Sequence, residues 1–404
     1  MNIHLPIHSL SVGDLSGEHH ARHMGSASSM NTITIGVLLP SSTILPMGKD
    51  FERALKHELQ EKLAENDFAI ELIPEFIGQG SKMAVEEAIN KLIGYHRVDA
   101  VTGVLSNQVA MEIAEKFEKH HIPFLLNNIG EHVPNPRRFN PYTFINSIHS
   151  WQQIWSLGYW AVHTFGKRGM FVASIYDAGY SFSNMLKLGM EAADSQSVMS
   201  FSIAQLQHDN KTANPKDVFK HIAEFRPDFI FGAFCGGEAS EFLQEYVHSG
   251  YYKQIPLLAL PFLLQPFDGR AQEITVYTAV TTTLDMENVQ PIIGELNTNS
   301  PFNELGSATG SVLAEALRNK GSRSLKEAIS EARAYSIRGA LQIDSSQPGR
   351  ANYVYLVKNT YSGDGHTIHM AVQSALETVD ITDDELMKSM EGPTSGWGNP
   401  YLGV

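Results

Sequence analysis

Cysteine is almost absent from this sequence, which holds one such residue, Cys235, among 404. A single cysteine forms neither a disulfide within the chain nor a cysteine-based zinc site, so both are excluded. The redox compartment therefore cannot be inferred from the sequence. We interpret the lone thiol as a small buried side chain at the end of an apolar strand, with a nucleophile as the alternative.

Positive charge and long apolar runs are also scarce. The chain has 30 lysine and arginine residues against 44 acidic ones, for a net charge of −14. Such a chain does not attract nucleic-acid phosphates or an anionic membrane surface, so we expect no nucleic-acid partner. The longest apolar runs have the length of strands, well below the ~20 residues of a transmembrane helix, so we expect no membrane span.

The N-terminal segment lacks the features of a secretory signal peptide. Residues 1–29 contain no basic segment and no apolar run of roughly 7–15 residues. They carry scattered histidines and then His-Met-Gly-Ser-Ala-Ser-Ser, which is typical of a cloning leader. We exclude this leader from the fold and expect the native chain to start at Met30, directly before the first strand.

The motifs of common enzymes are missing as well. The sequence has no Gly-x-Ser-x-Gly elbow, no P-loop and no His-Glu-x-x-His, and its first strand runs into 40–42, Pro-Ser-Ser, not a Rossmann glycine fingerprint. His120 and His121 fall at a helix end, where imidazoles commonly bind the last carbonyls. We predict no catalytic residues, no metal and no cofactor. A transferase or dehydrogenase, the enzyme alternative, needs a cofactor loop that the sequence does not show.

What the sequence does contain is a repeated alternation of strand and helix patterns. Apolar strand runs alternate with helical runs from residue 33 to 127, and this order predicts a parallel, doubly wound sheet. The alternation restarts at 151 and continues to 260, so the chain is predicted to form two α/β lobes with a cleft between them. Ligands in such sheets bind beyond the carboxyl ends of the strands. The expected strands are 33–39, 69–75, 99–105, 122–127, 168–176, 200–204, 228–234 and 255–260.

Two loops of the first lobe carry polar side chains directly after a strand. Ser106 and Asn107 open the helix after strand 99–105, where free backbone N–H groups suit a carboxylate. The alternative is plain capping of that helix. Asn127 and Asn128 follow the next strand, and their amides suit a polar ligand, with turn formation as the alternative.

Two loops of the second lobe offer acidic and aromatic groups. After strand 168–176 come the carboxylate of Asp177 and the phenols of Tyr176 and Tyr180. After strand 228–234, two glycines allow a close backbone approach and Glu238 stands at a helix start. Glu238 either faces a ligand or is only a favourable charge at the helix N-terminus.

In this order the segments resemble the branched-chain amino-acid (Leu/Ile/Val) type of substrate-binding protein of ABC transporters, which has the type I periplasmic binding fold. The resemblance covers roughly residues 32–360. Its carriers are 33–40, 103–106, 122–124, 142–144, Asp177 with Tyr180, 227–231 with 237–238, and 337–344.

The resemblance implies a solute-binding protein that is not an enzyme. It would capture a small polar molecule, namely an amino acid, an amide or a small carboxylate, by hinge closure between the lobes. Its partners would be ABC permease subunits and its location the periplasm. Because the chain lacks a signal peptide, a cytoplasmic ligand-sensing regulator on the same fold is the alternative.

The resemblance also implies roles for individual residues. Ser106 matches the position that holds the ligand carboxylate, with Asn127 or Asn128 beside it. Tyr180 matches the aromatic residue of the second lobe, and Glu238 the acid that faces the ligand ammonium. Met47 is the nearest match to an aromatic residue of the first lobe. The candidate ligand-binding residues are Ser106, Asn107, Asn127, Asn128, Tyr176, Asp177, Tyr180 and Glu238.

The fold class predicted is α/β, with two doubly wound parallel-sheet lobes joined by a three-strand hinge. The α/β pattern is interrupted at 144–146 and at 277–280, which places chain crossovers near 146–150, 277–284 and 336–341. The expected division is lobe one at 31–147 plus 282–337, lobe two at 148–281 plus 338–362, and a C-terminal extension at 363–404.

Overall fold

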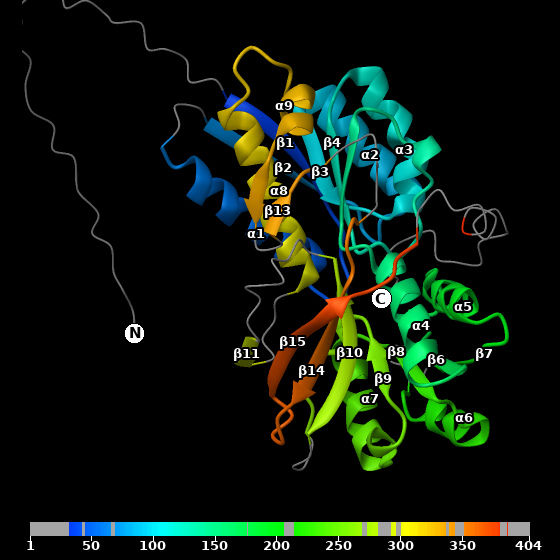
Figure 1. Cartoon of the computed structure of the whole chain (residues 1–404). Coiled ribbons are helices and arrows are strands. Elements are labelled where there is room, and N and C mark those ends of the chain that lie inside the picture. Colours follow the sequence, from blue (N-terminus) through cyan, green and yellow to red (C-terminus); the bar gives the residue numbers. More distant parts are fainter. Residues whose placement is uncertain are drawn as a thin grey trace, which may run out of the picture.

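Two sheets, each in its own lobe, form the protein in this computed structural model (Figure 1). The structure describes residues 32–42, 45–65, 69–175, 177–205, 214–268, 273–281, 292–295, 300–336, 339–343, 351–379 and 386. Among the helices in these ranges, none is long and apolar enough to cross a bilayer.

The sheet of lobe one has five parallel strands in the order β2-β1-β3-β4-β5. Every residue of its last three strands is buried, as expected where helices cover both faces of a parallel sheet. The strands are β1 (Thr32–Leu39), β2 (Ala69–Phe76), β3 (Ala100–Val104), β4 (Phe124–Asn128) and β5 (Thr143–Ser147).

Helices from both ends of the lobe-one sequence pack on this sheet (Figure 1). Gly306 lets α8 approach α1 closely, because a Cβ atom at that position would lie 2.4 Å from the carbonyl oxygen of Phe51. The helices are α1 (Met47–Leu63), α2 (Lys82–Lys91) with a π turn (Leu92–His96), α3 (Asn107–His120), α8 (Pro301–Arg318) and α9 (Leu325–Glu331), followed by the hairpin β12 (Ala334–Ser336) and β13 (Gly339–Leu341).

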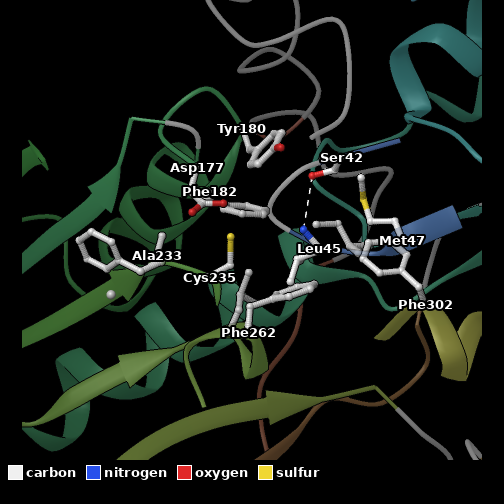
Figure 2. Close-up of a pocket in the computed structure, with 14 residues that line it drawn as sticks. Ser42, Leu45, Met47, Asp177, Tyr180, Phe182, Ala233, Cys235, Phe262 and Phe302 are labelled. Carbon is white, nitrogen blue, oxygen red and sulfur yellow. Dashed lines mark hydrogen bonds between the residues drawn. The ribbon is translucent and has the colours of Figure 1, made fainter. Parts of the chain in front are cut away.

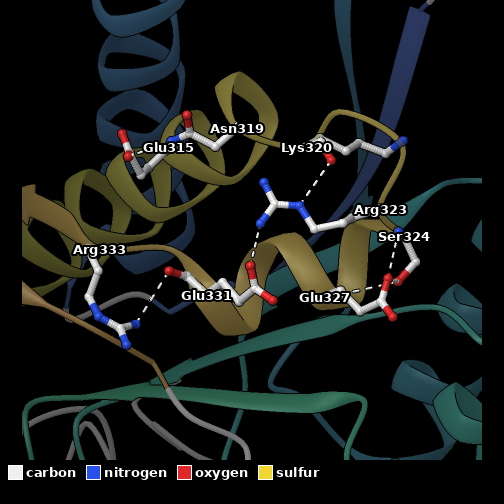
Figure 3. Close-up of polar contacts among 8 residues, drawn as sticks. All are labelled: Glu315, Asn319, Lys320, Arg323, Ser324, Glu327, Glu331 and Arg333. Atoms are coloured by element: carbon white, nitrogen blue, oxygen red, sulfur yellow. Dashed lines mark hydrogen bonds and ion pairs between the residues drawn. The ribbon is translucent and has the colours of Figure 1, made fainter.

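A capping box begins α9 (Figure 3). The Ser324 hydroxyl accepts the backbone N–H of Glu327 at 3.3 Å, and the Glu327 carboxylate accepts the backbone N–H of Ser324 at 2.9 Å. This reciprocal pair satisfies two N–H groups that the helix leaves without a partner. An ion pair joins Arg323, which precedes the helix, to Glu331, its last residue.

Lobe two contains a mixed sheet in the order β11-β15-β14-β10-β9-β8-β6-β7. The strands from β7 to β10 are parallel, and β14, β15 and β11 add to them in antiparallel pairs. The strands are β6 (Arg168–Ser174), β7 (Val198–Ala204), β8 (Phe229–Ala233), β9 (Leu257–Ala259), β10 (Ile274–Val280), β11 (Ile292–Glu295), β14 (Tyr355–Tyr361) and β15 (Thr367–Ala375). The helices are α4 (Ser150–Thr164), α5 (Phe182–Ala193), α6 (Asp217–Phe225) and α7 (Gly236–His248), with 3-10 turns at Tyr251–Lys253 and Pro261–Leu263; a further 3-10 turn, Pro136–Arg138, lies in lobe one between β4 and β5.

The α/β class with two sheet lobes is confirmed, but the sheet of lobe two differs from the expectation. It is not parallel throughout, because β14 and β15 form a hairpin closed by Asp364 and Gly365. An Asp-Gly pair between strands is a hairpin signal. Strand β15 therefore continues the sheet beyond residue 362, where lobe two was expected to end. This strand was not predicted because the segment from residue 363 onward has a polar composition.

The described elements change lobe at the first expected crossover, between β5 and α4. Strand β5 belongs to the sheet of lobe one, and α4 packs on α5 of lobe two. After the second, β11 still pairs with β15 in the sheet of lobe two, although lobe one was expected from residue 282. Strand β10 is in lobe two, and α8 packs on α1 in lobe one. At the third, β12 and β13 pair with each other. Residues 282–290 and 337–338 lie outside the described residues, so the boundaries stay a prediction.

Candidate functional site

A pocket lies between the two lobes. It encloses about 580 Å³, counting the part that is open to solvent. Lobe one contributes Ser42, Leu45, Met47, Ile129 and Phe302, and lobe two contributes Asp177, Tyr180, Phe182, Gly232, Ala233, Phe234, Cys235, Leu260 and Phe262.

The two lobes present different chemistry to this pocket. Figure 2 shows Asp177 and Cys235 on one side and Ser42, Leu45 and Met47 on the other. Aromatic rings of lobe two lie between these sides. The pocket is therefore acidic at one end and apolar over most of its remaining wall.

The acidic end is formed where β6 and β8 finish. Asp177 lies in the loop after β6, and Cys235 and Glu238 lie at the start of α7. The Cys235 thiol donates a hydrogen bond to the Asp177 carboxylate. Oδ2 of Asp177 is buried and, within the described part of the chain, has no hydrogen-bond partner. Because Asp177 lines the pocket, a group that enters the pocket can approach this carboxyl.

Burial governs the protonation of this end. It raises the pKa of Asp177 to about 8, and the nearby charge of Glu238 acts in the same direction, while the thiol hydrogen bond opposes both. Burial and the two carboxylates also raise the pKa of Cys235 well above its ordinary value. The thiol therefore stays protonated and is a hydrogen-bond donor, not a nucleophile.

Aromatic side chains enclose the middle of the pocket. Tyr180 is 7% exposed and packs on Phe182, with ring centroids 5.1 Å apart. Its other neighbour is His132 of lobe one, whose ring lies edge-on at 5.9 Å. Phe262 stands on the turn after β9 and Phe302 at the start of α8. Flat apolar ligand groups can stack on such rings.

Two polar contacts join the lobes beside this aromatic wall. The backbone N–H of Ser181 donates to the carbonyl oxygen of Glu131 at 3.0 Å. The Ser181 hydroxyl lies 3.1 Å from Nδ1 of His132. The loop after β4 therefore touches the loop after β6, which holds the lobes close together around the pocket.

The serine and asparagine predicted at the start of α3 are buried and do not line the pocket. Ser106 has no exposed surface, and its hydroxyl accepts the backbone N–H of Val109 at 3.2 Å as the N-cap of α3. Asn107 is 1% exposed and donates its amide to the carbonyl of His132 at 2.7 Å. Both side chains hold the first-lobe loops in place.

The predicted asparagine pair at the end of β4 is buried as well. The Asn127 amide donates to Thr102 at 3.0 Å, and its oxygen accepts from Asn146 at 2.9 Å and from Thr309 at 2.6 Å. This one side chain joins β4 to β3, β5 and α8. Asn128 donates to the Asn107 side chain at 2.8 Å. These amides thus serve the architecture of lobe one.

The structure brings together the second-lobe candidates that it describes. Asp177 and Tyr180 line the pocket, and Glu238, which is 8% exposed, lies close enough to Asp177 to raise its pKa. Tyr176 lies outside the described residues. Met47, matched to a first-lobe aromatic, also lines the pocket.

Sequence reasoning missed several residues around the pocket, and Glu131 is the most informative of them. Its Oε1 accepts the backbone N–H of Asn107 at 3.3 Å, so this carboxyl stands at the N-terminus of α3. Burial raises the pKa of Glu131 to about 7 against the opposing backbone hydrogen bonds. Phe262 and Phe302 were missed too. Each of the three lies in a loop or in the first turn of a helix. Many residues without a function have such positions, so the sequence offered no specific signal for these three.

Comparison with solved structures shows the same fold. An ABC transporter substrate-binding protein from Sphaerobacter thermophilus is 19% identical, with a TM-score of 0.64 over 88% of this chain and 99% of that one. A leucine-binding protein from Thermotoga maritima is 15% identical, with a TM-score of 0.57 over 85% and 99%. A solute-binding protein from Rhodopseudomonas palustris, in complex with 3,4-dihydroxybenzoic acid, is 15% identical, with a TM-score of 0.61 over 87% and 99%.

Among curated proteins, none matches this chain. A sequence model described as periplasmic binding protein, however, matches residues 32–358, which is most of the chain. This match and the shared fold confirm the resemblance inferred from the sequence. The chain belongs to the periplasmic binding protein family.

Proposed function

We propose that this protein captures a small molecule in the pocket between its lobes, for delivery to the permease of an ABC importer, and that it catalyses no reaction. The pocket carries this proposal, because both lobes line it and polar contacts join the lobes beside it. Ligand contacts made with both lobes at once stabilise the closed arrangement over the open one. Hinge closure would thus couple binding to a shape that a permease recognises.

Of the expected ligand classes, an amino acid or an amide suits the pocket better than a simple carboxylate. Asp177 carries the one carboxyl group among the described residues that line it. Its carboxylate pairs with an N–H group and repels an anion. Asp177, Tyr180 and Glu238 form the proposed contacts in lobe two. A ligand contact by Ser106, Asn107, Asn127 or Asn128 remains a prediction.

A thermal-shift screen tests the function. The panel consists of amino acids, amides, amines, aromatic acids and small peptides, each with the full chain. A ligand at ~100-fold excess over its Kd stabilises the folded state by about 2.7 kcal/mol, which is readily detected. A hit with a Kd in the micromolar range or below supports the proposal. A panel without hits, with permease components absent from pull-downs, contradicts it and favours a ligand-sensing regulator.

A further inference from the structure

We propose that the pocket selects a small organic cation, namely an ammonium group on an apolar body that carries no carboxylate. The proposal rests on the proposed function, solute capture between the lobes, and puts an amine in place of the amino acid or amide among its ligand classes. Two carboxyl groups of the chain carry it. Glu131 fills the place predicted for a ligand carboxylate, and Asp177 presents an unpartnered oxygen to the pocket.

Side chains of the protein itself already occupy the site at the start of α3 where a ligand carboxylate was predicted to bind. Glu131 accepts the N–H of Asn107 through Oε1, and the Ser106 hydroxyl accepts the N–H of Val109. These are the groups that a ligand carboxylate would need at a helix N-terminus. Unlike Asp177, neither Ser106 nor Glu131 is among the described residues that line the pocket, and both have no exposed surface, so a carboxylate cannot reach them without displacing side chains. An anion that entered this site would also be repelled by the negative charge of Glu131, which lies against the first turn of α3.

The opposite end of the pocket lacks a cation. Oδ2 of Asp177 is buried without a hydrogen-bond partner in the described chain, and the hydrogen bond that the carboxyl group does accept comes from the neutral Cys235 thiol. Glu238 adds a second negative charge nearby. No lysine, arginine or histidine is among the described lining residues. A buried carboxylate is costly without a charged or hydrogen-bonding partner, and a ligand ammonium supplies both.

The walls beside Asp177 suit the rest of such a ligand. The rings of Tyr180, Phe182 and Phe262 lie between Asp177 and the apolar first-lobe side (Figure 2). An ammonium group near aromatic rings is attracted to their electron-rich faces, and the attraction grows where water is excluded. Beyond the rings, Leu45 and Met47 provide an apolar surface for the body of the ligand.

Matched sets of small molecules test this proposal directly. One set is 2-phenylethylamine, phenylalanine and 3-phenylpropanoic acid, and the other is 3-methylbutylamine, leucine and 4-methylpentanoic acid. Calorimetry on the full chain at about pH 9 keeps Asp177 ionised and a primary amine protonated. We expect the amine to bind most tightly in each set, the amino acid at least about tenfold more weakly, and the acid not detectably.

Two variants assign the effect to the two carboxyl groups. Asp177→Asn should weaken amine binding about ten- to a hundredfold, since it removes a hydrogen bond to a charged acceptor. The control is Asp364→Asn, because Asp364 accepts the backbone N–H groups of His366 and Thr367 in the exposed β14–β15 turn. Glu131→Gln should raise the affinity for the amino acid about tenfold and leave that for the amine unchanged.

The outcomes separate this inference from the function on which it rests. Amino acids or acids that bind as tightly as the matched amine overturn the cation proposal and leave solute binding intact. The cation proposal also fails if neither amine binds while other solutes of the screen do, or if Asp177→Asn has no effect on amine binding. An unchanged affinity of Glu131→Gln for the amino acid overturns the role given to Glu131. A chain that binds nothing in the sets or the screen contradicts the function itself.

Discussion

His132 of lobe one lies against Ser181 of lobe two, with 3.1 Å between the imidazole Nδ1 and the hydroxyl oxygen. The backbone N–H of Ser181 also donates across the cleft to Glu131. Contacts of this kind exist only while the lobes are close together. Under the proposed hinge closure they belong to the closed state, whose population a ligand would raise by binding it more tightly than the open one.

The first prediction concerns the shape of the molecule in solution. If the ligand closes the hinge, the radius of gyration should fall when a ligand found in the screen saturates the protein. Small-angle X-ray scattering with and without that ligand measures this change. An unchanged radius under saturating ligand would refute hinge closure, even if binding itself is tight.

The second prediction concerns Ser181. Replacing it by alanine removes the hydroxyl at the lobe contact and keeps the backbone N–H. In the described structure the Ser181 side chain makes no capping hydrogen bond to α5, so the helix should not suffer. A neutral hydrogen bond contributes about 0.5–1.5 kcal/mol, so ligand affinity should fall by roughly two- to tenfold. The melting temperature of the ligand-free protein should hardly change; a large drop would mean that Ser181 serves the fold instead.

The third prediction separates capping from ligand binding at Ser106. Its hydroxyl caps α3, and an N-cap serine replaced by alanine costs about 0.5–2 kcal/mol of stability. Ser106→Ala should therefore melt at a lower temperature, with unchanged affinity for an amine ligand. Ser324→Ala, which removes the N-cap of α9, is the matched control (Figure 3). A ten- to hundredfold loss of affinity in Ser106→Ala alone would restore the serine to the ligand site.

Ser106 also shows where reasoning from sequence ended. The alternating pattern located the strands and helices, and with them the loops at the carboxyl ends of the strands, because burial periodicity is local. It also placed Ser106 at the start of a helix. It could not show that Glu131, 24 residues beyond Asn107 in the chain, turns back onto that same helix end. Such a contact depends on the path of the loop after β4, which no periodic pattern encodes.

The second lobe was easier to interpret for a physical reason. Asp177, Tyr180 and Glu238 lie directly after neighbouring parallel strands, whose carboxyl ends share one edge of a sheet. Their grouping follows from topology alone. The aromatic residues Phe262 and Phe302 come from a 3-10 turn and from a helix of the other lobe. Their common place in the pocket wall depends on how the two lobes sit against each other, which the sequence does not show.

The fourth prediction concerns stability against pH. The folded protein keeps the proton of Asp177 up to about pH 8, whereas the ordinary value is 3.8. The folded state thus binds more protons than the unfolded chain across this window, and Asp177 lowers stability as pH rises through it. Asp177→Asn removes this loss and keeps an oxygen for the Cys235 thiol.

The measurement is thermal unfolding of the ligand-free protein at about pH 5 and about pH 9. The gain of the variant over the wild type should be larger at the higher pH than at the lower pH by at least about 1 kcal/mol, or about 1–2 °C in melting temperature. Glu131, whose pKa is also raised, contributes equally to both proteins and cancels in the comparison. An equal gain at both pH values would mean that the charge of Asp177 is not the cause.

The last prediction concerns Glu238, whose negative charge acts on a ligand both directly and through Asp177. Directly, it attracts an ammonium group, so Glu238→Gln should weaken amine binding by about ten- to a hundredfold at about pH 9 and leave a simple carboxylic acid nearly unaffected. Indirectly, it helps to keep Asp177 protonated, because the two carboxylates repel each other. Removing it lowers the pKa of Asp177, so more of the variant has the ionised carboxylate at about pH 7. The variant should therefore lose less affinity at about pH 7 than at about pH 9, and calorimetry across this range measures both. If the affinities of the two proteins differ by the same factor at every pH, Glu238 does not act on Asp177. If the affinities are identical, Glu238 is not part of the ligand site.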